Sequence, residues 1–323
     1  MPQKIEISHK TIIFTVLFLA LLWFLYFIRD IILVFFVALL IMAILNPSVS
    51  RLARLHIPRV LAVILIYVLT IGILGLVISI LVPTFVEQTG HLLSLFPSLF
   101  QNIKFLPAIN DSLMNQIAGQ VGSVSASALK FTISAFSNIV SLVSVLVMAF
   151  YLLLSRDKFE QNIENFFGKA KEKKIKSFLS LWERNLGSWM RGQLLLMLSI
   201  GVLTFIGLSI LRVPFAVPLS ILAGLLEIVP IIGPLISAIP AAVVGFNISL
   251  VLGITVLILY FAVQQIENHL LAPKIMEKST GVNPVIVLLC LAIGMRISGV
   301  VGVLLAIPVY LTLKLLFKFY LLR

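Results

Sequence analysis

One ionisable residue stands beside helix-breaking residues in the segment EIVPIIGPLISAIPA, residues 227–241. Proline removes a backbone donor and clashes with the preceding turn of a helix, whereas glycine permits a sharp bend. The segment therefore predicts a turn whose backbone groups are free to face a solute or an ion. Its candidate residues are Glu227, Pro230, Gly233, Pro234 and Pro240.

Two roles are open to Glu227 in such a turn. Ionisable groups are costly in hydrocarbon, and those found there commonly mark ion or substrate pathways. Glu227 could therefore bind a proton or Na⁺. It could instead cap the free amides of the turn, or pair with Arg296. The sequence leaves ion coupling and a structural role both open.

A second set of polar residues lies downstream, next to and within apolar sequence. Gln264, Glu267 and Asn268 recur at three to four residues, so they share one helix face. They would line a polar cavity, or form an ordinary face at the membrane interface. Arg296, in the segment GMRISG, could attract an anionic or polyhydroxylated solute, or serve as the structural partner of Glu227.

The composition shows in what kind of protein these residues must be positioned. Of 323 residues, 61% are hydrophobic and only 11% are charged, and the mean hydropathy is +1.17. These values are far from a globular average and predict an integral membrane protein. Strand-type alternation is absent, so helices satisfy the backbone. Apolar runs suited to a core about 30 Å thick cover residues 11–28, 31–45, 60–82, 139–154, 194–211 and 249–263.

The net charge of +12 is distributed as in the cytoplasmic loops of a membrane protein. Basic residues gather near both ends of the chain, in residues 46–59 and in residues 155–193. We therefore expect both termini to be cytoplasmic in a bacterial inner membrane. No nucleic-acid-binding motif accompanies the charge, so nucleic acid is not an expected partner.

Two polar segments interrupt the apolar runs. Residues 83–136 are predicted to form extracytoplasmic amphipathic helices with breaks at Pro97 and Pro107, and to provide contacts for a homo-oligomer. Residues 155–193 are predicted to form an interfacial helical hairpin attracted to anionic lipid, with a regulatory or partner-binding site as the alternative.

The expected organisation follows from these segments. Transmembrane helices over 1–82 precede the external segment 83–136, a transmembrane helix over 137–154, the basic segment 155–193 and a transport core over 194–323. The predicted fold is an all-α polytopic membrane protein with about six crossing helices and two interrupted hairpins.

The two interrupted segments have a similar plan. Residues 218–245 are broken by VPIIGP, and residues 284–313 are broken by GMRISG and contain Pro308 in a second Ile-Pro pair. Two re-entrant hairpins from opposite faces would form an inverted repeat, the arrangement that places exposed backbone at the midplane of secondary transporters. A single tilted helix over 284–313 is the competing interpretation.

Three segments resemble the signatures of the autoinducer-2 exporter (AI-2E) family of bacterial membrane proteins. They are LEIVPIIGPLISAIPA, QQIENHLLAPKIMEKSTGVNPVIVLL and GVVGVLLAIP, beginning at residues 226, 264 and 299. The resemblance covers nearly the whole chain. It implies permease-like transport, with export of an autoinducer-2-like solute or sodium/proton exchange as the associated activities. The matching positions add Pro273, Asn283, Pro284, Gly299, Gly302 and Pro308 to the candidate path.

The chain departs from the family pattern at Glu277, where the family has a glycine after the second-signature proline. We expect Glu277 to lie in a cytoplasmic loop, so no loss of activity should follow.

Enzyme chemistry has no motif behind it. The four histidines are scattered, and neither a phosphate-binding glycine loop nor a His-Glu-x-x-His motif occurs. The single cysteine, Cys290, lies in an apolar run and is expected to pack there. We therefore expect no cofactor and no metal, and any active transport should use an ion gradient or the membrane potential.

Three functions remain open on the sequence alone. The first is a secondary transporter that exports a small polar solute by alternating access. The second is a monovalent cation/proton antiporter in which Glu227 is the coupling carboxylate. The third is a scaffold or channel that does not transport actively. An antiporter would usually have more than one carboxylate at depth, and only Glu227 is clearly placed there, which favours the first.

Overall fold

The computed structural model describes residues 9–101, 139–230, 232–276 and 284–320. Within these ranges the chain is helical and contains no strand, which confirms the predicted all-α fold class. Pro107, Glu277 and Asn283, all singled out in the sequence, lie outside the described residues.

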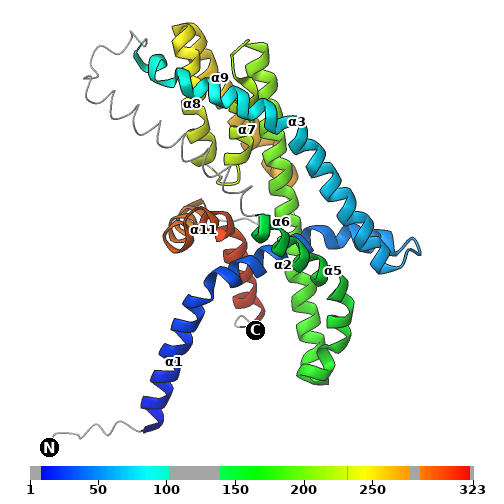
Figure 1. Cartoon of the computed structure of the whole chain (residues 1–323). Coiled ribbons are helices and arrows are strands. Elements are labelled where there is room, and N and C mark those ends of the chain that lie inside the picture. The colour runs from blue at the N-terminus through cyan, green and yellow to red at the C-terminus, as the bar shows by residue number, and fades with distance from the viewer. Residues whose placement is uncertain (1–8, 102–138, 231, 277–283, 321–323) are drawn as a thin grey trace, which may run out of the picture.

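Most of the helices are long (Figure 1). Their bounds are α1 His9–Phe27, α2 Arg29–Ala53, α3 Arg59–Gln101, α5 Ile139–Phe167, α6 Lys169–Ile210, α7 Ala216–Leu226, α8 Ile232–Ile248, α9 Leu250–Ile266, the π-helical turn η1 Glu267–Leu271, α10 Ala272–Met276 and α11 Pro284–Tyr320.

Among the described residues, six helices are long and apolar enough to cross a membrane. They cover Lys10–Phe27, Arg29–Ala53, Arg59–Phe85, Glu172–Ile210, Leu250–Met276 and Val285–Phe319. The first five overlap predicted crossings. The apolar run predicted to cross over 137–154 forms the first part of α5, which the structure describes from Ile139 onward, and it is not among these six. The shorter apolar helices α7 and α8 accompany the six.

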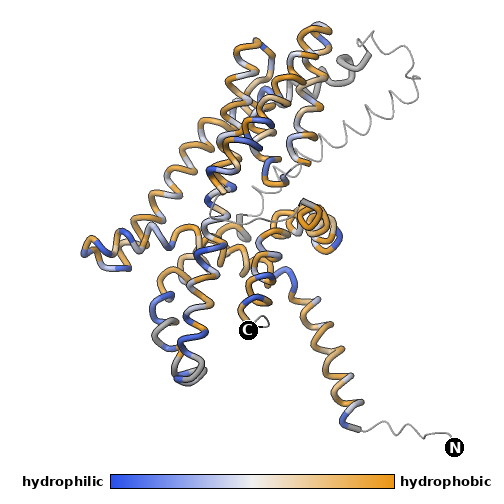
Figure 2. Tube along the Cα trace, turned by 180° about the vertical axis from the view of Figure 1, so that it is seen from behind, coloured by the Kyte–Doolittle hydropathy of each residue, from blue (hydrophilic) through white to orange (hydrophobic). Residues whose placement is uncertain are grey.

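Both polar segments of the sequence are helical where the structure describes them. The break expected at Pro97 is wrong, because α3 continues as one helix to Gln101. The basic segment 155–193 forms the end of α5 and the beginning of α6. These helices pack together as a hairpin that reverses at Gly168, where φ is +78°. Figure 2 shows apolar residues along most of α1, and hydrophilic residues toward the free end of this hairpin.

The described helices share two main hydrophobic cores, and α6 takes part in both. The first core, which we call the hairpin core, joins the second half of α6 to α7, α8 and α9. Small residues let the backbones approach closely there, as is common between membrane helices. A Cβ atom on Gly224 would lie 3.2 Å from the Cα of Gly201, and one on Gly245 would lie 3.0 Å from the Cα of Gly253.

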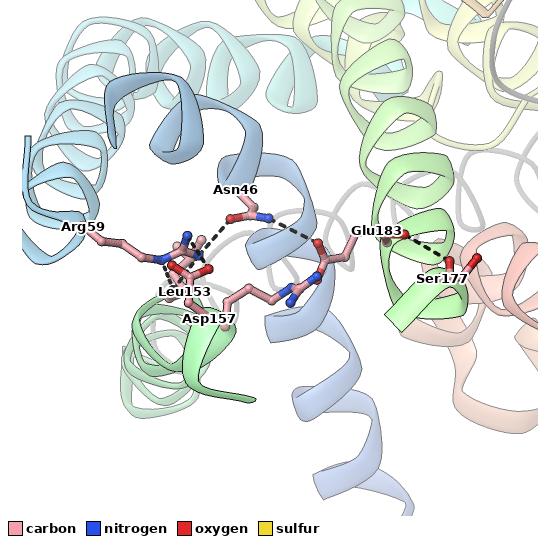
Figure 3. Close-up of polar contacts among 8 residues, drawn as sticks. Asn46, Arg59, Leu153, Asp157, Ser177 and Glu183 are labelled. Carbon is pink, nitrogen blue, oxygen red and sulfur yellow. Dashed lines mark hydrogen bonds and ion pairs between the residues drawn. The ribbon is translucent and has the colours of Figure 1, made fainter. Parts of the chain in front are cut away.

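The second core, which we call the scaffold core, joins α2, α3, α5, the first half of α6 and the end of α11. Trp182 of α6 is buried there and donates a hydrogen bond from Nε1 to Oγ1 of Thr312 on α11, at 3.0 Å. The scaffold core also contains a network of polar side chains (Figure 3).

The centre of this network is Asn46 on α2. Its Oδ1 accepts from Nη2 of Arg59 at 3.2 Å, and its Nδ2 donates to Oε2 of Glu183 at 3.2 Å. Arg59 also pairs with Asp157, with Nη1 and Oδ1 2.7 Å apart, and Glu183 pairs with Arg156. Each charge therefore has a partner of opposite sign, and four helices are tied together.

Pro47 leaves one carbonyl group of α2 without its helical hydrogen-bond donor, and a side chain of α6 donates to it. Since proline has no N–H, the carbonyl of Ala43 lacks its helical donor. Nη1 of Arg191 lies 3.2 Å from that carbonyl oxygen and 3.1 Å from that of Ile44. A Cβ atom at Gly187 would collide with the Ala43 carbonyl, so glycine permits this close approach.

The second interrupted segment also reverses direction. Residues 294 and 302 would be about 12 Å apart along one continuous helix. Instead the backbones of Gly294 and Gly302 touch, so closely that a Cβ atom on either would collide with the other's carbonyl. The break falls at Ser298 and Gly299, where φ is −144° and +56°. The predicted interruption at GMRISG is thus present in α11.

A buried carboxyl pair at the turn between α7 and α8

The turn after α7 is formed by the residues that the sequence singled out. The helix ends at Leu226, and its carbonyl accepts from the N–H of Val229 at 2.9 Å. The carbonyl of Pro230 accepts from the N–H of Ile232, and that of Val229 accepts from Gly233, each at 2.9 Å. A Cβ atom at Gly233 would collide with the Leu226 carbonyl. Glycine is therefore required for the reversal.

The lengths of α8 and α9 bring a second carboxylate to this turn. The two helices pack as an antiparallel pair, linked near Ser249, whose Oγ caps α9 by accepting from the N–H of Leu252. Each contains 17 residues, so each is about 25 Å long. The residue after α9, Glu267, consequently returns to the level of Glu227. There the helix widens into η1, a π-helical turn of the kind often found at functional sites.

The two carboxyl groups meet in the protein interior. Glu227 is 1% exposed and Glu267 is 6% exposed. Their side chains lie close enough for a hydrogen bond when one of them carries a proton. Among the described residues, no lysine or arginine forms an ion pair with either.

Neutral amides complete the pair. Nε2 of Gln264 donates to Oε2 of Glu267 at 2.7 Å. Nε2 of Gln193, a buried residue of α6, donates to the backbone carbonyl of Glu227 at 2.7 Å. Oε2 of Glu227 has no partner within the described part of the chain. The site therefore holds two acidic groups, two amides and one buried oxygen that accepts nothing.

This arrangement is suited to holding one small cation. Two buried carboxylates in contact repel each other, so both are ionised together only at a large free-energy cost. A proton or a monovalent cation between them removes that cost and satisfies the free oxygen. Within the described residues no third histidine, cysteine or carboxylate joins the pair, and divalent cations such as Ca²⁺ usually recruit more oxygen ligands than two side chains supply.

A polar stripe leads from the pair along α9. Tyr260, Gln264 and Glu267 are spaced at four and three residues, and so lie on one helix face. The hydroxyls of Tyr260 and of Thr204 on α6 are buried and have no partner among the described residues. The hairpin core therefore contains buried hydroxyl groups without hydrogen-bond partners among its apolar residues.

The remaining candidates are distributed around this site or lie away from it. Asn268 is exposed and accepts from Gln264 at 3.5 Å. Pro234 and Pro240 lie within α8, and Pro273 is exposed on α10. Pro284 begins α11, Gly299 and Gly302 form its reversal, and Pro308 is buried in its second arm.

The pairing of Glu227 with Arg296, one of the alternatives left open by the sequence, does not form. Arg296 is exposed near the reversal of α11, whereas Glu227 is buried between α6, η1 and its own hairpin. The alternative in which Glu227 pairs with Arg296 is therefore wrong. In addition, Glu227 is not the only carboxylate at depth, because the widened end of α9 turns Glu267 inward.

Two participants were missed in the sequence. Gln193 ends the basic segment and directly precedes the apolar run 194–211. An amide at the border of a crossing was the signal that could have identified it. Tyr260 lies one helical turn before Gln264, and extending the Gln264–Glu267 face backward would have included it.

Comparisons with known proteins show the family of the chain. The family model described as AI-2E family transporter matches residues 12–322. YueF of Bacillus subtilis is 29% identical over 85% of this chain and 80% of its own length. The Escherichia coli protein named AI-2 transport protein TqsA is 27% identical over 90% of this chain and 86% of its own length. The chain therefore belongs to the AI-2E transporter family and is a multi-pass membrane transporter.

Proposed function

We propose that this chain is a secondary active transporter for a small polar solute, driven by a proton or Na⁺ that binds between Glu227 and Glu267. The contact between two buried carboxyl groups carries the proposal. Two buried carboxyl groups in contact are costly when both are ionised, and a proton or cation between them lowers that cost. A site that binds and releases a proton or cation can use this difference.

Coupling follows from the cost of an empty site. A single charge in hydrocarbon costs roughly 2.5 to 3.5 kcal/mol on insertion scales. The empty, ionised pair carries two negative charges and the occupied pair carries one, so the empty pair resists exposure to the low-dielectric part of the membrane more strongly. Because Glu227 sits on the α7–α8 turn and Glu267 on η1, movement of the hairpin against α9 opens or closes the site. Alternating access is thereby linked to ion binding.

The solute is best sought among small polyhydroxylated molecules. TqsA is named for transport of AI-2, and we extend that solute class and outward transport to this chain. Tyr260, Gln264 and Gln193 supply hydroxyl and amide groups of the kind that recognise hydroxyls. Cytoplasmic termini and a homo-oligomeric assembly complete the proposal.

A monovalent cation/proton antiporter is the second candidate. A lone carboxylate had counted against it, and burial of Glu267 beside Glu227 removes that objection. In this case the pair itself would bind Na⁺ and H⁺ in turn, and no organic solute would be needed.

Flux in proteoliposomes separates the candidates. We expect imposed pH and Na⁺ gradients to drive efflux of AI-2 from the wild type, and each of Glu227→Gln and Glu267→Gln to uncouple it. Glu87→Gln, which alters an exposed carboxylate on α3, is the matched control. Na⁺-dependent proton movement without solute would select the antiporter. Solute flux that ignores both gradients in every variant would overturn ion coupling.

A further inference from the structure

A pocket of about 410 Å³ lies between α6 and the end of α11, away from the carboxyl pair. Its basic residues are Lys174 on α6 and Lys314 and Lys318 on α11, and its apolar residues include Leu181, Leu311 and Leu315. Among the described residues that line it, none is acidic. A pocket with three cations and an apolar floor is complementary to an anionic amphiphile.

Aromatic rings hold two of these lysines in place. Nζ of Lys174 lies 5.9 Å from the ring centroid of Phe319, and Nζ of Lys314 lies 5.9 Å from that of Tyr310. These distances are within the range of cation–π attraction. The rings of Phe319 and Phe178 are 5.4 Å apart, which ties the end of α11 to α6. The lysines are therefore presented by a packed helix pair.

The position of the lysines on their helices suits a lipid headgroup. Lys314 and Lys318 lie in the last turns of α11, at the end of its second arm, and Lys174 lies in the basic first part of α6. Lysines near the ends of membrane helices commonly place their ammonium groups at the headgroup level. The leucines lie beside the lysines on the same two helices, where an acyl chain would lie.

We propose that this pocket binds one anionic phospholipid, with its phosphate among Lys174, Lys314 and Lys318 and an acyl chain against Leu181 and Leu315. Basic pockets between membrane helices are known to select anionic headgroups. The bound lipid joins the beginning of α6 to the end of α11, two segments that the scaffold core also joins through Trp182 and Thr312. The lipid attraction expected for residues 155–193 is thereby confined to a defined site.

Native mass spectrometry of the full-length protein in detergent, titrated with phosphatidylglycerol or phosphatidylcholine, tests this site. We expect one tightly retained phosphatidylglycerol and no retained phosphatidylcholine. Each contributing lysine should be worth about fivefold in affinity, so Lys314→Gln with Lys318→Gln should weaken binding about twenty-five-fold. The matched control is Lys158→Gln with Lys173→Gln, which removes equal charge from exposed positions of the same hairpin.

Two further measurements separate a lipid from a soluble anion. Leu181→Asn changes only the apolar wall, and we expect it to weaken binding of phosphatidylglycerol. Inorganic phosphate at millimolar concentration should not displace the lipid. Equal losses in the pocket and control variants, equal retention of phosphatidylcholine, or displacement by phosphate would each overturn the proposal.

Discussion

The scaffold core and the hairpin core both bury ionisable groups, but they arrange them in opposite ways. In the scaffold core, Arg156 pairs with Glu183 and Arg59 pairs with Asp157, and Asn46 bridges the two pairs. In the hairpin core, Glu227 contacts Glu267, and one of its oxygens has no partner in the described part of the chain.

This difference distinguishes a structural network from a proposed binding site. A network with matched charges holds helices in one arrangement, and removing one member leaves another charge uncompensated. A pair of like charges is complete only when a proton or cation is added. The same residue type, glutamate, therefore has a structural role at position 183 and is proposed to have an ion-binding role at positions 227 and 267.

The largest expected effect comes from neutralising the carboxyl pair. We expect Glu227→Gln or Glu267→Gln to reduce ion affinity about 100-fold, since a hydrogen-bonded charged ligand contributes about 3 kcal/mol and each 1.4 kcal/mol is tenfold. The glutamine amide can donate to the remaining glutamate, so thermal stability should not fall. Combining the two changes should add little, because either one already destroys the site.

Measurement of Na⁺- and pH-dependent flux beside thermal unfolding in detergent checks this. If both variants unfolded at much lower temperature and the surviving protein still coupled normally, the pair would belong with the structural networks.

The next largest effect is expected at the turn that carries Glu227. Gly233→Ala places a Cβ atom against the Leu226 carbonyl, so the turn must shift. We expect a loss of about 2 to 3 kcal/mol in stability, typical of overpacking, and loss of coupled transport. Gly75→Ala is the matched control, because nothing surrounds Gly75 on α3 and alanine favours a helix by up to about 1 kcal/mol.

Thermal unfolding and flux of the two glycine variants give the comparison. Equal stabilities of the two variants would contradict the prediction, because they would show that the turn accommodates a Cβ atom at residue 233.

The sequence predicted the hairpin turns better than it predicted their surroundings. Proline and glycine act on the backbone locally, so VPIIGP and GMRISG indicated reversals that the structure contains. The face shared by Gln264 and Glu267 was also predictable, since helical spacing is local. Whether that face met a cavity, lipid or another carboxylate depended on the lengths of α8 and α9 and on the π turn.

Partnerships between distant segments were beyond local patterns. The sequence suggested Arg296 as a partner for Glu227 because its charge is opposite, yet packing placed Glu267 beside Glu227. Pro97 was expected to end a helix, but α3 continues through it. A proline indicates a missing donor, and only tertiary packing decides whether the helix tolerates the loss.

A smaller effect is expected on breaking the scaffold network. Glu183 and Arg156 are 11% and 9% exposed in their side chains, whereas Asp157 is 50% exposed. We expect Glu183→Gln to cost about 3 kcal/mol, since it removes a buried carboxylate that pairs with Arg156, and Asp157→Asn to cost less than about 1 kcal/mol. Unfolding in detergent measures both.

Neither change should alter the ion dependence of transport in the folded fraction. A shift in ion dependence as large as that of Glu227→Gln would show that the two polar regions are one coupled system.

The smallest expected effect concerns a single hydrogen bond between α6 and α2. Arg191 satisfies the Ala43 carbonyl that Pro47 leaves without a donor. We expect Arg191→Met to cost about 1 to 2 kcal/mol in the wild type. In a Pro47→Ala background the restored N–H of residue 47 can bond that carbonyl, so the same change should cost about 1 kcal/mol less.

Arg184→Met, which alters an exposed arginine on α6, controls for loss of charge. Unfolding of the four variants of the cycle isolates the coupling. An equal cost of Arg191→Met in both backgrounds would mean that its bond to Ile44, which Pro47 does not affect, supplies the whole contribution. A coupling of the expected sign would show that the scaffold core supplies a donor to the carbonyl that Pro47 leaves free. The hairpin core, by contrast, leaves Oε2 of Glu227 and the hydroxyls of Tyr260 and Thr204 without partners among the described residues, as a site that awaits a ligand would.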